Sequence, residues 1–168
     1  GITKKVHYMI NSANWLKTEL FVDDAPVRLS SAVRDFYREL DFRTGELTRG
    51  YRFASPSGAE VAVEFRRLLS MDDPAGACQR VVLTALKGAP KIRLSLSIDF
   101  AIVHWGKFNF WKVAAAATHA GRTAMIGALP NGQRLFSGFR LKTSRPVAES
   151  EFRKEKELGR TLSFSLSE

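Results

Sequence analysis

Residues 60–66, Glu-Val-Ala-Val-Glu-Phe-Arg, alternate strictly between apolar and polar or small side chains. Val61, Val63 and Phe65 fall on one side of this period-two pattern, which is the periodicity of a β-strand with one buried face. The preceding Ser55-Pro56-Ser57-Gly58 offers proline for the second position of a turn and glycine for a positive φ. The segment therefore predicts a β-hairpin, and it limits the chain to folds that bury one face of an antiparallel sheet.

Further strands are predicted along the whole chain, separated by short turns. Asp23-Asp24 and Asn131-Gly132 are typical turn formers. In residues 91–99 apolar and polar side chains alternate most regularly, so one face of that strand is expected in the core and the other in water. Segment 144–159 fits either a short exposed helix or a solvated hairpin. The other predicted strands are 18–22, 27–29, 34–42, 46–53, 80–86, 113–118, 123–129, 133–141 and 161–166.

Some ten to twelve strands at short spacing, without a helix of ordinary length, indicate an all-β protein built of antiparallel sheets. Long two-faced strands favour a two-sheet β-sandwich over a closed barrel. A chain of 168 residues is long enough to bury one core without disulfides. We therefore expect a single β-sandwich domain over residues 1–168.

The single cysteine, Cys78, cannot form an internal disulfide, and at the start of a strand it is expected to be a small buried residue. No apolar run approaches the roughly 20 residues of a membrane-spanning helix, and the first residues contain no long apolar stretch. These features predict a cytoplasmic protein without a membrane partner.

A formal net charge of +9 raises the question of nucleic-acid binding. The lysines and arginines are spread over nearly all predicted strands, and they often alternate with apolar residues as in Lys91-Ile92-Arg93-Leu94. That spacing is typical of a solvated sheet face. No nucleic-acid-binding motif accompanies it, so a nucleic-acid partner is not expected.

Motifs for catalysis and for cofactor binding are missing from the sequence, so no catalytic residue, metal site or cofactor is predicted. His104 and His119 have no third metal ligand at a sensible spacing. Asp72-Asp73 precede Pro74 and are typical of a turn. Residues 101–112 are unusually aromatic, and such a cluster can fill a core, line an interdomain seam or stack on sugar rings.

Several consecutive motifs resemble the N-terminal domain of glycoside hydrolase family 65, which includes maltose, trehalose and kojibiose phosphorylases. The similarity extends from about Met9 to Asp99 and continues more weakly beyond Phe100. The motifs are N-S-A-N-W-L at 11–16, R-E-L-D-F-R-T-G-E-L-T-R at 38–49, S-P-S-G at 55–58, V-A-V-E-F-R-R-L-L-S-M-D-D-P at 61–74, Q-R-V-V-L-T-A-L at 79–86 and S-L-S-I-D at 95–99.

The resemblance implies a two-sheet super-sandwich like that of galactose mutarotase, here incomplete relative to the family's N-terminal domain. In the family a linker and a catalytic (α/α)6 barrel follow, and the barrel carries the general acid and the phosphate-binding residues. No catalytic residue can therefore be transferred to this chain. The expected partners are the barrel of the same parent chain, a second copy in a homodimer, and an oligosaccharide.

Two functional hypotheses follow. The first is a non-catalytic domain that braces the barrel of an enzyme acting on α-linked disaccharides and assists dimerisation. The alternative is a stand-alone carbohydrate-binding module that uses the aromatic cluster. Residues expected to contact a sugar or a neighbouring domain are Asn14, Trp15, His104, Trp105 and Trp111, although Trp15 also suits a core position.

Overall fold

The computed structural model describes residues 9–29, 32–104 and 107–167. Within these residues the chain forms twelve β-strands and no helix, which confirms the all-β prediction. The described residues accordingly contain no helix long and apolar enough to cross a membrane. The strands are β1 (Asn14–Val22), β2 (Ala25–Pro26), β3 (Val33–Asp41), β4 (Glu46–Ala54), β5 (Glu60–Leu69), β6 (Ala77–Lys87), β7 (Lys91–Asp99), β8 (Lys112–His119), β9 (Arg122–Ala128), β10 (Arg134–Arg140), β11 (Ala148–Lys154) and β12 (Glu157–Ser165).

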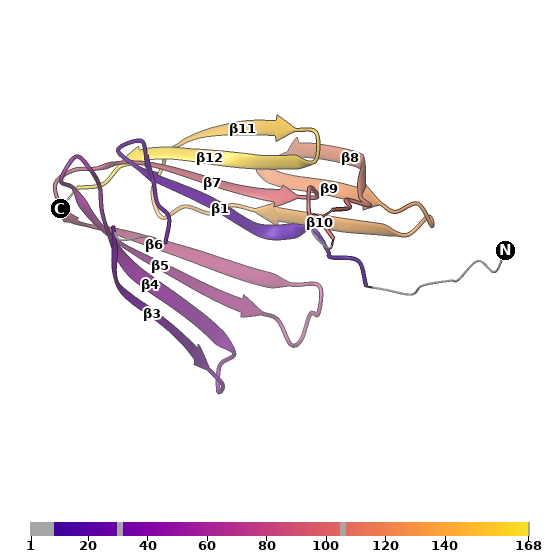
Figure 1. Cartoon of the computed structure of the whole chain (residues 1–168), viewed down its shortest axis with the longest axis horizontal. Helices are drawn as coiled ribbons and strands as arrows, with labels where there is room; N and C mark the ends of the chain where they lie inside the picture. The colour runs from indigo at the N-terminus through magenta and orange to yellow at the C-terminus, as the bar shows by residue number, and fades with distance from the viewer. Residues whose placement is uncertain (1–8, 30–31, 105–106, 168) are drawn as a thin grey trace. The chain divides into compact units, whose positions relative to one another are not determined.

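The strands form three sheets, with the orders β3-β4-β5-β6, β10-β9-β8 and β11-β12-β7-β1-β2. The chain divides into two compact units, which are described separately below. Unit 1 comprises Gly1–Thr18, Leu96–Pro146 and Ser150–Thr161, and unit 2 comprises Glu19–Ser95, Val147–Glu149 and Leu162–Glu168. Strands β1, β7, β11 and β12, which are labelled in Figure 1, contribute residues to both units. The expectation of a single domain stays a prediction.

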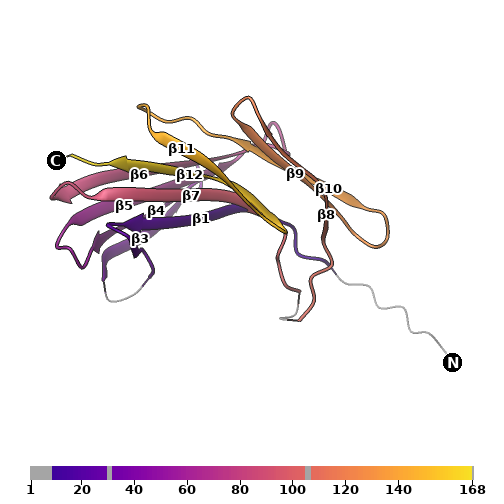
Figure 2. The same cartoon turned by 90° about the horizontal axis from the view of Figure 1, so that it is seen from above.

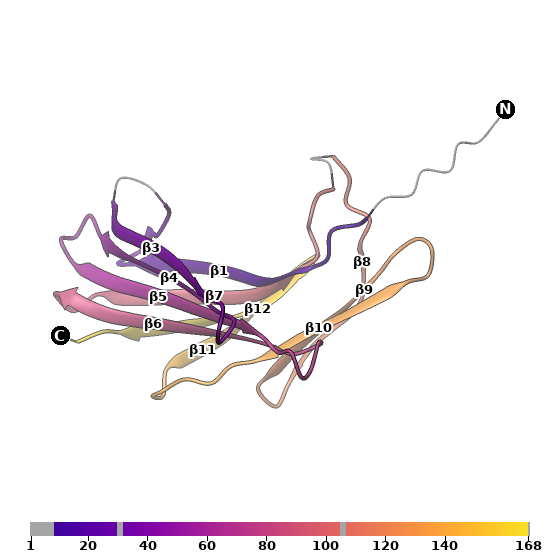
Figure 3. The same cartoon turned by 90° about the horizontal axis from the view of Figure 1, so that it is seen from below.

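The four-stranded sheet of unit 2 is an antiparallel meander (Figure 3). Its β4–β5 hairpin forms at the predicted turn, where Gly58 has a φ of 87°. The Ser55 amide donates to the Ala59 carbonyl at 2.9 Å and closes the loop. Only a residue without Cβ adopts this backbone conformation readily, so the glycine determines where the chain reverses.

Asp23, at the turn between β1 and β2, has a φ of 48° and confirms the predicted turn. Its carboxylate accepts hydrogen bonds from the Ser57 hydroxyl at 2.6 Å and from the Lys91 amide at 2.8 Å. The bond from Ser57, followed by that from the Lys91 amide, lowers the Asp23 pKa from its ordinary value. A residue that the sequence marks as a turn former thus also connects three segments of unit 2.

The core of unit 2 is filled from two sheets, as in a β-sandwich. Val61, Val63 and Phe65 of β5 are buried on the face that their alternation predicts. The four-stranded sheet adds Tyr51 and Phe53, and β1, β7 and β12 contribute Leu20, Val22, Ile92, Leu94 and Leu162. The two-sheet prediction is therefore confirmed, because apolar side chains of both sheets leave water together.

In unit 1, β8, β9 and β10 lie side by side as an antiparallel sheet (Figure 2). The alanine-rich segment 113–118 is a strand, as predicted. A core cluster comprises Ala13, Ile98, Phe100, Trp111, Met125 and Leu158. Phe100 is fully buried, and its ring fills the space in which a Cβ at Gly127 of β9 would lie.

Three expectations about individual elements are wrong. The polar face of β7 is solvated only at its start, where Lys91 is exposed and Arg93 is partly exposed. Ser95, Ser97 and Asp99 of this central strand of the five-stranded sheet are buried. Cys78 is exposed because its position on β6 lies opposite Leu68, on the face of the sheet away from the core. Residues 27–29 are not a strand, since β2 ends at Pro26.

Segment 144–159, which the sequence left open between helix and hairpin, contains β11 and the start of β12. Their connection spans only residues 155–156, and β12 continues to Ser165. Strand 161–166 of the prediction is therefore the end of a longer strand, and its Leu162 and Leu166 are buried as the alternation indicated.

The contact between Gly127 and Phe100 generates the first prediction. Gly127→Val should destabilise the protein by about 1–3 kcal/mol, because an added side chain displaces a fully buried ring. The measurement is the free energy of unfolding from urea denaturation. Gly138→Val is the matched control on β10. A Cβ at Gly138 would lie 3.2 Å from Phe136 Cζ, and that ring is exposed and can move. Equal losses in both variants would contradict the proposed packing role.

Candidate functional site

Trp111, one of the residues expected to contact a sugar or a neighbouring domain, is buried in the core cluster of unit 1. Its indole Nε1 donates to the Asn11 carbonyl at 2.8 Å. The Phe100 ring meets it edge-on, with centroids 5.3 Å apart. Because both its ring and its polar atom have protein partners, Trp111 acts here as a packing residue.

His104 is also buried, and its ring centroid lies 6.0 Å from that of Phe110. Its backbone pairs with Phe108, whose exposed ring stacks on Phe110 at 6.0 Å between centroids. Trp105 lies outside the described residues. The structure describes residues 101–104 and 107–112 of the predicted aromatic cluster. Among their aromatic side chains, Phe108 is the one that is exposed.

Asn109 shapes the backbone of this aromatic segment. Its Nδ2 donates to the carbonyls of Phe100 and Ile102 at 2.7 and 3.0 Å. Its Oδ1 accepts from the Trp111 amide at 3.1 Å and from Lys156 Nζ at 2.9 Å. Since the donors and the acceptor of this amide have protein partners, its observed role is structural.

Asn14 and Trp15 begin β1. The Asn14 Oδ1 accepts a hydrogen bond from the Leu16 amide at 3.1 Å, which is a local turn interaction. Trp15 is 39% exposed, so it is not the buried core residue that its type suggested. The two residues thus start a strand, and Trp15 retains an accessible part of its ring.

A cluster of charged side chains lies among β1, β7 and β12 in unit 1. Lys17 Nζ lies 2.8 Å from Asp99 Oδ2 and 2.9 Å from Glu157 Oε2. Glu157 also accepts from Ser97 Oγ at 2.8 Å and from Lys154 Nζ at 3.1 Å. With two carboxylates, two ammonium groups and a hydroxyl mutually paired, the cluster is satisfied within the protein.

The pKa values follow from these contacts. Burial alone would raise the Glu157 pKa, but hydrogen bonds from Lys17, Ser97 and Lys154 outweigh it and hold the pKa below its ordinary value. Burial likewise opposes charge on Lys17, yet its bonds to Asp99 and Glu157 raise the Lys17 pKa. No neutral carboxyl or neutral amine results that could act as a general acid or base near neutral pH.

The described residues contain no group of three or more His, Cys, Asp or Glu side chains that could hold a metal ion. Asp73 caps a turn by accepting from the Ala75 amide at 3.0 Å, as its sequence context predicts. The expectation that the chain binds no metal or cofactor stays a prediction.

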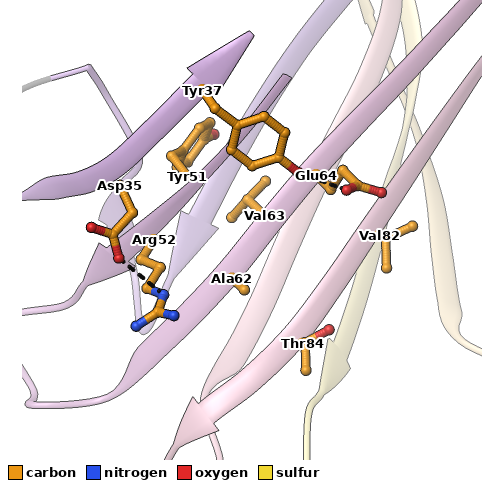
Figure 4. A pocket seen from close by; sticks show the side chains of 9 residues that line it. All are labelled: Asp35, Tyr37, Tyr51, Arg52, Ala62, Val63, Glu64, Val82 and Thr84. Carbon is orange, nitrogen blue, oxygen red and sulfur yellow. Dashed lines mark hydrogen bonds and ion pairs between the residues drawn. The ribbon is translucent and has the colours of Figure 1, made fainter. Parts of the chain in front are cut away.

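A hollow of about 330 Å³ lies on the four-stranded sheet at β3, β4, β5 and β6, and its lining includes Tyr51 and Val63. We call it the outer groove and define it by Asp35, Tyr37, Arg52, Glu64 and Thr84, with Ala62 and Val82 between them (Figure 4). The strand register explains this grouping, because Gly50 pairs with both Tyr37 and Glu64, and Ala62 pairs with both Arg52 and Thr84.

Three polar contacts involve side chains of the outer groove. Tyr37 Oη donates to Glu64 Oε2 at 2.7 Å, Arg66 Nε donates to Glu64 Oε1 at 2.7 Å, and Arg52 Nε lies 3.2 Å from Asp35 Oδ2. The first bond raises the pKa of Tyr37 and lowers that of Glu64, so the carboxylate is ionised at neutral pH. The sequence analysis missed these residues, because their grouping depends on strand register and on an irregularity in β3.

Three arginines are neighbours on the core-facing side of the same sheet. Arg38 pairs with Arg49 across β3 and β4, and Arg49 stacks over the Phe65 ring at 4.6 Å. Arg67 follows on β5 and donates to Gln79 at 2.7 Å. Burial, then repulsion from Arg49 and Arg38, lowers the Arg67 pKa. Among the described residues none of the three has an ion pair, so we call this set the arginine row.

Large apolar side chains are exposed where two hairpins of this sheet end together. Phe42 is 91% and Met71 96% exposed, and Leu68 approaches the position of a Cβ at Gly45 to 3.8 Å. We call this set of exposed apolar side chains the tip patch, although strand alternation places Leu68 and Leu69 on opposite faces of the sheet. Its members are Leu40, Phe42, Leu68, Leu69 and Met71. Exposed apolar groups gathered in this way are typical of interaction sites.

The fold defines an antiparallel β-sandwich protein. The chain belongs to glycosyl hydrolase family 65: the model of that family's N-terminal domain matches residues 1–168. The family resemblance found in the sequence motifs is thereby confirmed.

A solved structure described as a putative kojibiose phosphorylase from human microbiome has the same fold, with a TM-score of 0.84 and 26% sequence identity. The similarity covers 94% of this chain and 20% of that protein, so the chain spans about a fifth of the length of this relative. The comparison with curated proteins gives no match.

The charged cluster generates a prediction about stability. Lys17→Met should cost about 3 kcal/mol, because it leaves the buried Asp99 and Glu157 carboxylates without their shared ammonium group. Lys154→Met is the matched control; that side chain is 61% exposed, and its loss should cost less than about 1 kcal/mol. Urea denaturation at neutral pH measures both values, and similar costs would contradict the assigned role of Lys17.

The same experiment has a pH dependence of known sign. Because the folded-state pKa of Glu157 is depressed, its contribution is present above the ordinary value of 4.5 and is lost as pH falls through the lower folded value. The difference between wild type and Glu157→Gln should therefore shrink in acid below that value. A difference that stays constant from neutral pH into acid would contradict the pairing.

Proposed function

We propose that this chain is a non-catalytic N-terminal domain of a family 65 enzyme that acts on α-linked disaccharides by phosphorolysis or hydrolysis. Its role is to brace the catalytic (α/α)6 barrel of the parent protein and to assist dimerisation, in the cytoplasm. The observation that carries this proposal is the tip patch, whose members offer an apolar surface at the end of one sheet.

The arginine row supports a covering protein surface of defined charge. Three neighbouring guanidinium groups without an ion-pair partner among the described residues repel one another, and the burial of Arg67 increases that cost. A partner surface with carboxylates opposite the arginine row would offset the repulsion among its guanidinium groups. Apolar side chains of the same partner would remove the tip patch from water. The catalytic barrel is the partner that the family relationship makes available.

The alternative is a stand-alone carbohydrate-binding module that uses residues 105–111. The observation in its favour is Phe108, which is 53% exposed and stacked on Phe110. Burial of Trp111 and His104 leaves fewer rings accessible than the sequence suggested. We therefore favour the bracing role, because the tip patch on unit 2 exposes five large apolar side chains and the described part of the aromatic segment exposes one ring, Phe108.

A non-catalytic role predicts that the isolated chain releases no glucose 1-phosphate from kojibiose, maltose or trehalose in phosphate buffer. The physical reason is that the contacts of the charged cluster lower the pKa of Glu157 and raise that of Lys17, so neither side chain is a neutral acid or base near neutral pH. A coupled assay for glucose 1-phosphate measures this, with a full-length family 65 phosphorylase as the positive control. Turnover by the purified chain, absent from a mock purification, would overturn the assignment.

Bracing predicts that substitutions in the tip patch act only where the barrel is present. In the isolated chain, Phe42→Ser should change the free energy of unfolding by less than about 0.5 kcal/mol, because Phe42 is exposed. In the full-length enzyme the same substitution should lower stability by about 2 kcal/mol, the cost of losing one buried aromatic side chain.

Phe136→Ser is the matched control for this comparison, since Phe136 on β10 is 69% exposed but lies outside the tip patch. It should be neutral in both proteins. Equal effects of Phe42→Ser in the isolated chain and in the full-length enzyme would show that the barrel does not cover the tip patch.

A further inference from the structure

The position of Tyr37 in the outer groove results from an irregularity in β3. Arg34 pairs with Arg52, but the next paired residues are Tyr37 and Gly50, so the register shifts between them. Asp35, within the shift, has a φ of 52°, which is unfavourable for a residue other than glycine. Bulges of this kind re-aim side chains, and such strain is often found at functional sites.

The Tyr37 ring is held in one place on the sheet. It lies against Gly50, and a Cβ at that position would collide with the ring. Its hydroxyl is fixed by the 2.7 Å hydrogen bond to Glu64. The ring nevertheless remains 44% exposed. The groove therefore contains an immobilised aromatic surface, open to solvent, which loses little conformational freedom when a ligand covers it.

Hydrogen-bonding groups surround this ring on neighbouring strands (Figure 4). Arg52 and Asp35 form an ion pair whose side chains are 60% and 65% exposed, so each can exchange its partner for a ligand at small cost. Glu64 accepts from Tyr37 at Oε2 and from Arg66 Nε at Oε1, and each oxygen keeps a further lone pair for a ligand hydroxyl. Thr84 contributes a hydroxyl. The short side chains of Ala62 and Val82 leave space between these groups.

We propose that the outer groove binds a pyranose unit of a neutral oligosaccharide. The nonpolar C–H face of a sugar ring stacks on Tyr37, while vicinal hydroxyls donate to Asp35 and Glu64 and accept from Arg52. Each carboxylate is paired with one guanidinium, Asp35 with Arg52 and Glu64 with Arg66, so these groups leave no excess positive charge for an anionic ligand such as a sugar phosphate. The site is separate from the aromatic segment 101–112 and from the tip patch, so it stands independently of the proposed bracing role.

The test is a titration of the ¹⁵N-labelled chain with kojibiose and with maltose, followed by NMR. Saturable shifts of the Gly50, Ala62 and Thr84 amides are expected, with millimolar affinity for a shallow open site. Tyr37→Ala should weaken binding about tenfold, because it removes the stacking surface. Phe136→Ala, an exposed aromatic residue on β10, is the matched control and should leave the affinity unchanged.

Arg52→Ala is a second variant, which leaves the Tyr37 ring in place and serves if Tyr37→Ala fails to fold. It should also weaken sugar binding. Urea denaturation checks the folding of each variant. Three results would overturn the proposal: no shifts at high millimolar sugar, equal affinity in wild type and both variants, or shifts confined to Phe108 and its neighbours. Tighter binding of glucose 1-phosphate than of kojibiose would also overturn it, since it would assign an anion site.

Discussion

The ammonium group of Lys17 contacts the carboxylates of Asp99 and Glu157 within unit 1. These residues belong to β1, β7 and β12, which are adjacent in the order of the five-stranded sheet. Buried carboxylates are costly without a positive partner. The order of these strands brings Lys17 beside Asp99 and Glu157, and the ion pairs in turn make the burial of the two carboxylates possible. The interaction also explains how Ser97 and Asp99 can be polar and buried at once.

The local features of the fold were predictable from the sequence because they depend on neighbouring residues. Alternation identified the buried face of β5, and turn chemistry placed the reversals at Asp23 and Gly58. The contacts of Lys17 could not be predicted, since its partners lie 82 and 140 residues away in the chain. The solvated face expected for 91–99 failed for the same reason, because periodicity does not reveal what covers a strand.

The candidate site shows a similar division. Sequence reasoning selected aromatic residues by their density, yet Trp111 and His104 are buried and Trp15 is only partly exposed. The outer groove depends instead on a register shift in β3 that brings Tyr37 beside Gly50 and Glu64. Composition and spacing carry no signal for such a shift, although the family relationship and the fold were both evident from consecutive motifs.

Unit 2 presents different chemistry on different parts of one sheet. The arginine row and the tip patch combine positive charge with apolar surface, whereas the outer groove combines one exposed ring with carboxylates. A protein partner and a small neutral ligand make different demands on a surface, and the two proposed contacts use different residues of the sheet. The four-stranded sheet thus has room for two separate contacts.

The irregularity in β3 has a further consequence for how the protein behaves in solution. β3 is the terminal strand in the order of its sheet, and such a strand exposes amide and carbonyl groups that can template the addition of a foreign strand. The shift between Arg34 and Tyr37 interrupts this row of groups and twists the strand locally. We therefore expect the same distortion that directs Tyr37 to make β3 a poorer template for the addition of a foreign strand.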